Sequence, residues 1–253
     1  MIRGTSANPD TYFQSREATN PWYNAVYDHV EQAMNDFSAA TGRQYQPFEY
    51  YGHPQAERVI ILMGSAIGTC EEVVDELLTR GEKVGVLKVR LYRPFSARHL
   101  LQALPGSVRS VAVLDRTKEP GAQAEPLFLD VMTALAEAFN NGERETLPRV
   151  IGGRYGLSSK EFGPDCVLAV FAELNAAKPK ARFTVGIYDD VTNLSLPLPE
   201  NTLPNSAKLE ALFYGLGSDG SVSATKNNIK IIGNSTHGTH RVILFTTPKR
   251  RAA

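Results

Sequence analysis

From residue 58 onward the sequence alternates short apolar runs with amphipathic segments, and this alternation restricts the possible folds most strongly. Runs of apolar and small residues occur at 59–63, 84–89, 111–114, 150–153 and 183–187. After each of the first four, apolar residues recur with helical spacing, as they do in 69–80, 96–104, 127–139 and 164–176. Strands that helices cover on both faces read as continuous apolar runs. The sequence therefore predicts an α/β fold with a doubly wound, mostly parallel sheet.

The flanking segments divide the chain further. Residues 1–54 are expected to connect, through one helix that Pro21 opens and that ends near Gly42, to the α/β domain over 55–187. The aromatic run Phe48, Tyr50 and Tyr51 reads as packing surface. Four prolines in 188–207 indicate a linker. Residues 208–253 then suit the truncated start of a second α/β domain, with a strand over 211–214, a helix over 221–230 and a new strand at Ile231.

Composition narrows the class of function. The chain has 27 basic and 27 acidic residues, a balance that argues against a general binder of nucleic acid or of membrane surfaces. Its two cysteines, Cys70 and Cys166, are far apart in sequence and favour reduced thiols in a cytoplasmic compartment. No apolar run approaches the roughly 20 residues of a spanning helix, and the N-terminus has no apolar core of a signal peptide.

One glycine-rich motif could bind phosphate. Residues 215–220 read Gly-Leu-Gly-Ser-Asp-Gly, which is the pattern GxGxxG, between an expected strand and an expected helix. Glycines allow close backbone approach, and a helix N-terminus offers free N–H groups to an anion. An ordinary tight turn explains the motif equally well. A dinucleotide site is disfavoured, because no carboxylate stands about twenty residues further on.

Other polar clusters have structural readings at least as good as functional ones. The charged stretch 115–121 follows a parallel strand, where active sites of such sheets gather, but ion pairs at a domain contact explain it better. Arg90, Arg93 and Arg98 could meet a phosphate or line a packed inter-domain edge. His237 and His240 are too few for a metal site by themselves, so no metal ligand is assigned.

Several long stretches resemble the pyruvate:ferredoxin (flavodoxin) oxidoreductase family. They occur in the family's order and span the chain from about residue 4 to about residue 234. The stretches are residues 12–14, 16–18 and 20–21, GEKVGVLKVRLYRPFSARHLLQALP (81–105), VAVLDRTKEPGA (111–122), GGRYGLSSKEF (152–162), FTVGIYDDVTNLSLPLP (183–199) and GLGSDGSVSATKNNIKIIG (215–233).

The resemblance implies an internal fragment of a much longer enzyme. That enzyme oxidatively decarboxylates pyruvate to acetyl-coenzyme A with thiamine diphosphate, Mg and [4Fe–4S] clusters, and passes electrons to ferredoxin or flavodoxin. The fragment would hold the end of the first domain, the whole second domain, which is similar to the C-terminal domain of transketolases, and the start of the coenzyme A-contacting third domain. Its expected partners are the remaining domains, in a homodimeric enzyme. No catalytic residue falls in this chain, and two cysteines cannot ligate a four-iron cluster, so the isolated chain is expected to be inactive.

The resemblance also assigns a partial coenzyme A site. The family's loop falls on Gly217, Ser218, Asp219, Gly220 and Ser221, where Ser221 replaces a threonine. After Asn234 the resemblance stops, so half of the site is missing. Two classes of function remain open: a fragment of this oxidoreductase, or a stand-alone, non-catalytic α/β interaction module derived from it.

Overall fold

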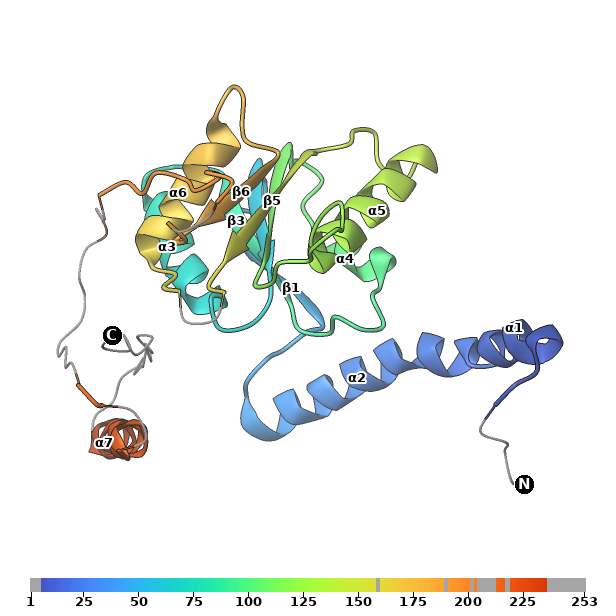
Figure 1. The fold of residues 1–253 in the computed structure, drawn as a ribbon, viewed down its shortest axis with the longest axis horizontal. Coiled ribbons are helices and arrows are strands. Elements are labelled where there is room, and N and C mark those ends of the chain that lie inside the picture. The colour runs from blue at the N-terminus through green and yellow to red at the C-terminus, as the bar shows by residue number, and fades with distance from the viewer. Residues whose placement is uncertain are drawn as a thin grey trace.

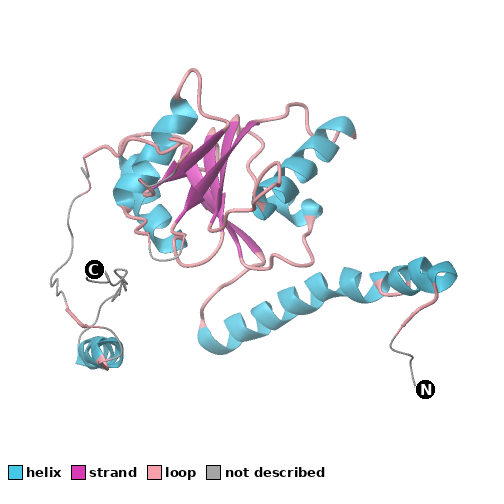
Figure 2. Ribbon diagram, viewed as in Figure 1, coloured by secondary structure: helices cyan, strands magenta, loops and turns pink. Residues whose placement is uncertain are grey.

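The structure is a computed structural model that describes residues 6–157, 160–188, 191–200, 203, 213–216 and 219–235. Its centre is a six-stranded sheet in the order β1-β3-β2-β4-β5-β6 (Figures 1 and 2). The strands are β1 (Phe48–Gly52), β2 (Arg58–Leu62), β3 (Val84–Val89), β4 (Ser110–Asp115), β5 (Arg149–Tyr155) and β6 (Arg182–Val185). All neighbouring pairs are parallel except β1 and β3, which confirms the mostly parallel α/β fold.

Helices cover both faces of the sheet. Helices α3 (Ile67–Thr79) and α6 (Pro164–Asn175) pack together on one face, and α4 (Ala97–Ala103) and α5 (Pro126–Asn140) on the other (Figure 1). Alternate residues of one strand therefore enter different cores: Ile60 packs in the cluster that includes α3 and α6, and Ile61 in the cluster that includes α4 and α5. Burial on both faces is the reason that these strands read as unbroken apolar runs.

The strand order has a topological switch point at the carboxyl ends of β2 and β4. After β2 the chain turns toward β3 on one side, and after β4 it turns toward β5 on the other. In doubly wound sheets this switch point is where ligands usually bind. The residues that follow β2 and β4, from Met63 and from Arg116, are therefore the first place to look for a site.

The N-terminal segment differs from the expectation of one helix. Two helices, α1 (Pro9–Glu17) and α2 (Asn20–Thr41), precede β1. Strand β1 lies inside the expected connecting segment 1–54, so a boundary at 55 separates it from the sheet to which it is bonded. The aromatic run does serve as packing surface: the Tyr50 ring lies on Gly85 of β3, where a Cβ would be 2.1 Å from the Tyr50 hydroxyl oxygen.

The expected linker is in part a component of the α/β domain. Leu196 is buried, its N–H donates to the carbonyl of Thr184, and Thr184 N–H donates to the carbonyl of Leu194. Leu198 and Leu203 pack against the core beside α3 and α6. The chain therefore continues along the edge of β6 after the turn that follows this strand, and this edge is covered.

The C-terminal expectations are partly wrong. Helix α7 (Ser221–Ser235) begins where the sequence predicted, but it continues through Ile231 and Ile232, which were expected to open a strand. Residues 213–216 do not form the expected strand, and residues 211–212 lie outside the described residues. Among the described residues, no helix is long and apolar enough to cross a bilayer.

Candidate functional site

The described part of the glycine-rich loop is closed on itself by Asp219. The Asp219 carboxylate accepts hydrogen bonds from the Leu216 N–H at 2.7 Å and the Ser221 N–H at 3.0 Å. Together with a hydrogen bond from the Ser221 side chain, these donors lower the pKa of Asp219 to about 2. The carboxylate is therefore ionised at neutral pH and occupies donors that a phosphate would use.

The remaining loop geometry is that of a helix start. Gly220 has φ +81°, a left-handed conformation that favours glycine, and its carbonyl accepts the N–H of Ala224. The side chain of Thr225 in α7 is largely buried and donates to the Ser221 carbonyl at 2.8 Å. Of the five expected site residues, Asp219, Gly220 and Ser221 lie together here, and Gly217 and Ser218 lie outside the described residues. The Leu216 and Ser221 N–H groups can bind an anion only after the Asp219 carboxylate moves away.

Asp115, the last residue of β4 and the first of the charged stretch 115–121, is hydrogen-bonded inside the domain. Buried Asp115 accepts the backbone N–H groups of Leu127 at 2.9 Å and Phe128 at 3.1 Å, and so caps the N-terminus of α5. Burial raises the pKa of Asp115, while the two N–H bonds oppose that rise. Next to it, the Arg154 guanidinium donates to the Glu125 carboxylate at 2.6 Å, and both side chains are largely buried. Asp115 therefore has a structural role through backbone N–H groups and not through the expected ion pairs, and the Arg154–Glu125 pair lies outside residues 115–121.

Tyr155 connects the ends of two strands across the switch point. Its hydroxyl donates to the carbonyl of Met63, directly after β2, at 3.0 Å. Burial raises the pKa of Tyr155 to about 12, so the phenol stays protonated. The Arg116 guanidinium donates to the Gly156 carbonyl at 2.9 Å. Side chains of the domain itself therefore tie together the carboxyl ends of β2, β4 and β5.

Arg90 and Arg93, two of the three arginines considered for phosphate, form ion pairs. The Arg90 guanidinium contacts Glu49 at 2.6 Å, and the Arg93 guanidinium contacts Asp130 at 2.8 Å. Arg93 also lies over the ring of Tyr92, with its Cζ 3.9 Å from the ring centroid. Arg98 is exposed on α4. The ion pairs compensate two of the three charges, which favours the packed-edge interpretation.

The sequence analysis missed a cluster of ion pairs around the buried Lys88, which joins β1, β3 and α3. The Lys88 side chain is only 4% exposed, and its ammonium contacts Glu49 of β1 and, at 2.8 Å, Glu71 of α3. Since Glu49 also pairs with Arg90, two carboxylates balance two cations. A lysine inside the run Val84–Val89, whose other residues are apolar or glycine, was the signal that could have indicated this cluster, because a buried lysine needs a charged partner.

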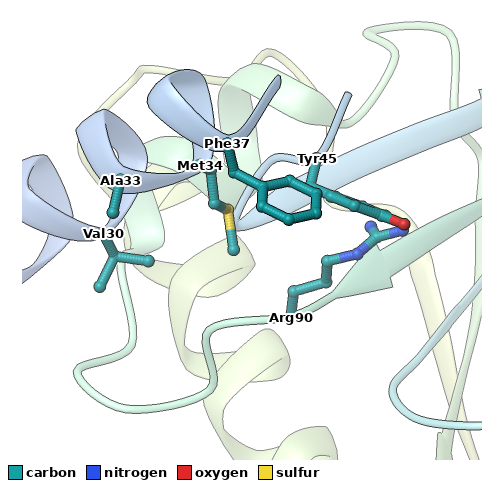
Figure 3. Close-up of a pocket in the computed structure, with 6 residues that line it drawn as sticks. All are labelled: Val30, Ala33, Met34, Phe37, Tyr45 and Arg90. Atoms are coloured by element: carbon teal, nitrogen blue, oxygen red, sulfur yellow. The ribbon is translucent and has the colours of Figure 1, made fainter. Parts of the chain in front are cut away.

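Two surface cavities lie near Arg90. One, of about 570 Å³, is at the carboxyl ends of β2 and β3 and is lined by Met63, Gly64, Ile67, Val89 and Arg90. The other, of about 380 Å³, is an apolar groove lined by Val30, Ala33, Met34, Phe37, Tyr45 and Arg90 (Figure 3).

The described residues supply neither a metal cluster nor a reactive thiol. No group of three His, Cys, Asp or Glu side chains that could hold a metal ion occurs among the residues described, and His237 and His240 fall outside them. Cys70 and Cys166 are buried, and burial raises the pKa of both thiols. Neither thiol has the exposed, electropositive surroundings of a nucleophilic cysteine.

Comparison with known proteins gives a family match for part of the central domain. Residues 56–156 match the family model of pyruvate:ferredoxin oxidoreductase core domain II. The chain is 99% identical over 236 residues to a probable pyruvate-flavodoxin oxidoreductase of Escherichia coli, covering 93% of this chain and 20% of that protein. It is 56% identical over 236 residues to the pyruvate:ferredoxin oxidoreductase of Moorella thermoacetica, again covering 20% of the relative.

One solved structure has a more distant similarity. It is a 2-oxoglutarate:ferredoxin oxidoreductase from Magnetococcus marinus with 2-oxoglutarate, coenzyme A and succinyl-CoA bound. It has 18% identity and a TM-score of 0.41, covering 68% of this chain and 24% of that one. The chain thus spans about one fifth of the length of the two relatives that it resembles in sequence.

Proposed function

We propose that the chain is a structural part of a pyruvate:ferredoxin (flavodoxin) oxidoreductase, without activity of its own. Residues 56–156 match the model of that family's core domain II. The complete enzyme would oxidatively decarboxylate pyruvate to acetyl-coenzyme A and pass the electrons to flavodoxin or ferredoxin, in the cytoplasm and as a homodimer. The observation that carries this proposal is the 99% identity over 236 residues to a relative of which the chain spans only 20%.

The chain's own residues do not fit the redox cofactors of the complete enzyme. A [4Fe–4S] cluster takes four thiolate ligands, whereas the chain has two cysteines, and both are buried. We therefore assign the clusters to the rest of the longer polypeptide.

The role that the geometry supports for the α/β domain is a rigid scaffold. The polar side chains described at its switch point have internal partners: Asp115 with α5, Arg154 with Glu125, and Tyr155 with the Met63 carbonyl. Satisfied, buried groups of this kind fix the ends of strands and do not present free donors to a ligand. A scaffold of this kind would hold the catalytic domains in place.

Coenzyme A is the ligand we propose for the loop at Gly217–Ser221, with low affinity in this chain. The N-terminus of α7 supplies a partial positive charge of about half an elementary unit. Asp219 opposes binding, because its ionised carboxylate occupies the N–H groups of Leu216 and Ser221. Displacing the carboxylate and ordering the loop would cost roughly 1–2 kcal/mol per residue fixed, so we expect millimolar binding at best.

Reconstitution tests the proposal. The purified chain, supplied with iron, sulfide, thiamine diphosphate, magnesium and coenzyme A, should not reduce a viologen dye with pyruvate, whereas the full-length E. coli relative should. Turnover by the isolated chain above a no-protein control would overturn the proposal. The alternative, a stand-alone interaction module, predicts a native polypeptide of 27.7 kDa in the source cell.

A further inference from the structure

An apolar stripe along α2 is only partly covered by the rest of the described chain. Val30, Ala33, Met34 and Phe37 recur at helical spacing and form one wall of the apolar groove, and Tyr45 and Arg90 form the other (Figure 3). Trp22 and Val26 extend the same spacing toward the start of the helix. From Trp22 to Phe37 the stripe is about 22 Å long at 1.5 Å per residue.

The helix is attached to the domain at one edge of the stripe, through Tyr27, which precedes Met34 by seven residues and so lies about 20° from it around the helix. Tyr27 is buried, and its ring is stacked on His99 of α4 with ring centroids 3.6 Å apart. Figure 1 shows α1 and α2 extending away from the sheet and its helices. Along that extension Trp22 is 78% exposed and Phe13 is 70% exposed, and Phe37 at the other end is 44% exposed.

Several aromatic side chains of α1 and α2 are highly exposed, which is unusual for a surface without a binding partner. Tyr12, Phe13, Trp22 and Tyr23 lie within two successive helices, and each is more than half exposed. Single exposed apolar residues are normal, but several exposed aromatic residues on two successive helices are typical of a protein–protein contact. Trp and Tyr also contribute most to such contacts.

Charge identifies the kind of partner. Helices α1 and α2 carry Asp10, Glu17, Asp28, Glu31 and Asp36 against one basic residue, Arg16, although the whole chain has no net charge. Arg90, in the wall of the groove opposite α2, is already paired with Glu49. A second copy of these helices would set acidic surface against acidic surface, which is unfavourable. A segment with apolar residues flanked by Lys and Arg would be complementary to the apolar stripe and to the acidic side chains of these helices.

We propose that the stripe from Trp22 to Phe37, with its groove, is a docking surface for an apolar, basic-flanked segment of the longer polypeptide. This inference rests on the proposed function, because it takes the occupant from the four fifths of the relatives' length that this chain does not span. An extended or helical segment would lie along α2, with an apolar side chain in the groove beside Phe37 and Tyr45 and its basic residues toward Glu31 and Asp36.

Hydroxyl-radical footprinting with mass spectrometry tests the proposal. A match of 236 residues in a chain of 253 necessarily includes residues 22–37, so the E. coli relative contains this region. Oxidation of Trp22 should be at least roughly tenfold slower in the full-length relative than in the isolated chain, given its 78% exposure here. Phe139, 44% exposed on α5, serves as an internal reference.

A pair of matched variants separates docking from folding. Ala33→Asp places a carboxylate on the exposed stripe, and Asn24→Asp adds the same charge about 200° around the helix from Val26. In the full-length relative, A33D should restore Trp22 oxidation toward the isolated-chain rate and N24D should not. In the isolated chain, both variants should have wild-type helicity and unfolding transitions.

Each other outcome overturns the proposal. Equal oxidation of Trp22 in both proteins would mean that the stripe has no occupant, although the chain could still be part of the enzyme. Protection that rises with the concentration of the isolated chain would mean that a second copy is the occupant. If A33D and N24D have equal effects, the stripe is not the contact. A native polypeptide of 27.7 kDa would instead contradict the proposed function itself.

Discussion

Replacement of Asp115 by Ala tests whether the charged end of β4 is a structural cap. The substitution removes both acceptors of the Leu127 and Phe128 N–H groups and leaves two donors buried at the start of α5. An unsatisfied buried donor costs roughly 1–3 kcal/mol, and loss of a cap costs roughly 0.5–2 kcal/mol. Relief from burying a carboxylate that is 2% exposed offsets part of this cost. We expect a net loss of about 2–3 kcal/mol in the free energy of unfolding.

Thermal and urea unfolding of the isolated chain measure this loss. A loss of this size lowers the Tm by roughly 5–10 °C for a protein of this length. Asp115→Asn retains one acceptor oxygen and should lose about half as much. Glu145→Ala, at an exposed position, should change the stability by less than about 0.5 kcal/mol. If D115A is no less stable than E145A, the carboxylate is not a cap and the reasoning fails.

The pH dependence supplies a second check with a defined sign. Burial raises the pKa of Asp115 in the folded state above its unfolded value of about 3.9. At a pH between the unfolded and the folded pKa of Asp115, the folded state binds more protons than the unfolded state. The contribution of this carboxyl group to stability therefore falls as the pH rises from the lower to the higher of these pKa values. Wild type should therefore become more stable relative to D115N as the pH is lowered toward 4. The opposite trend would mean that the N–H bonds outweigh burial.

Three further predictions follow from packing and from the loop. Gly153→Ala should destabilise the chain by about 1–3 kcal/mol in urea unfolding, because its Cβ would lie 2.4 Å from the fully buried Phe183 ring. Gly106→Ala, whose Cβ would meet nothing within 4 Å, should be neutral or slightly stabilising. Equal effects of the two substitutions would contradict close packing of Phe183 on β5. Cys70 and Cys166 should react with a thiol reagent at least roughly a hundredfold more slowly in the native chain than in guanidinium, and prompt reaction would contradict their burial. Asp219→Ala should strengthen coenzyme A binding by roughly two- to fivefold in calorimetry, because it frees two N–H groups and removes an anion. Glu200→Ala removes the same charge elsewhere and should leave the affinity unchanged. Equal affinities of the two variants would exclude Asp219 as a competitor of coenzyme A.

The sequence predicted the parallel part of the fold because burial on both faces leaves a strong pattern. Strands such as Val84–Val89 are apolar throughout apart from Gly85 and Lys88, and the helices between them have one apolar face. Strand β1 was missed because Phe48–Gly52 mixes aromatic and charged residues, as an antiparallel edge strand does. Helix α1 was missed because none of its residues is buried, so it has no apolar periodicity to detect.

The errors at the C-terminal end have two different physical causes. Ile231 and Ile232 are β-branched, and intrinsic propensity favours a strand, but the preceding turns of α7 continue through them. The prolines of 188–207 indicated a linker, whereas Leu196 is held by hydrogen bonds with the Thr184 backbone. Contacts between residues distant in sequence decide such segments, and local composition does not reveal them.

The candidate site followed from sequence only as a loop position. The GxGxxG spacing located the turn before α7, but the occupation of its N–H groups by Asp219 depends on the three-dimensional geometry. The same holds for Asp115, whose place at a strand end suggested either function or structure until its bonds to α5 were seen.

The mass of the native polypeptide that contains these residues tests the central claim most directly. Immunoblotting of the source cell with an antibody against residues 56–156, with mass spectrometry of the band, measures it. If the chain is a structural part of an oxidoreductase, the band should be about five times heavier than 27.7 kDa, because the matched residues make up 20% of the relatives. A single band at 27.7 kDa would contradict the account and favour a separate interaction module.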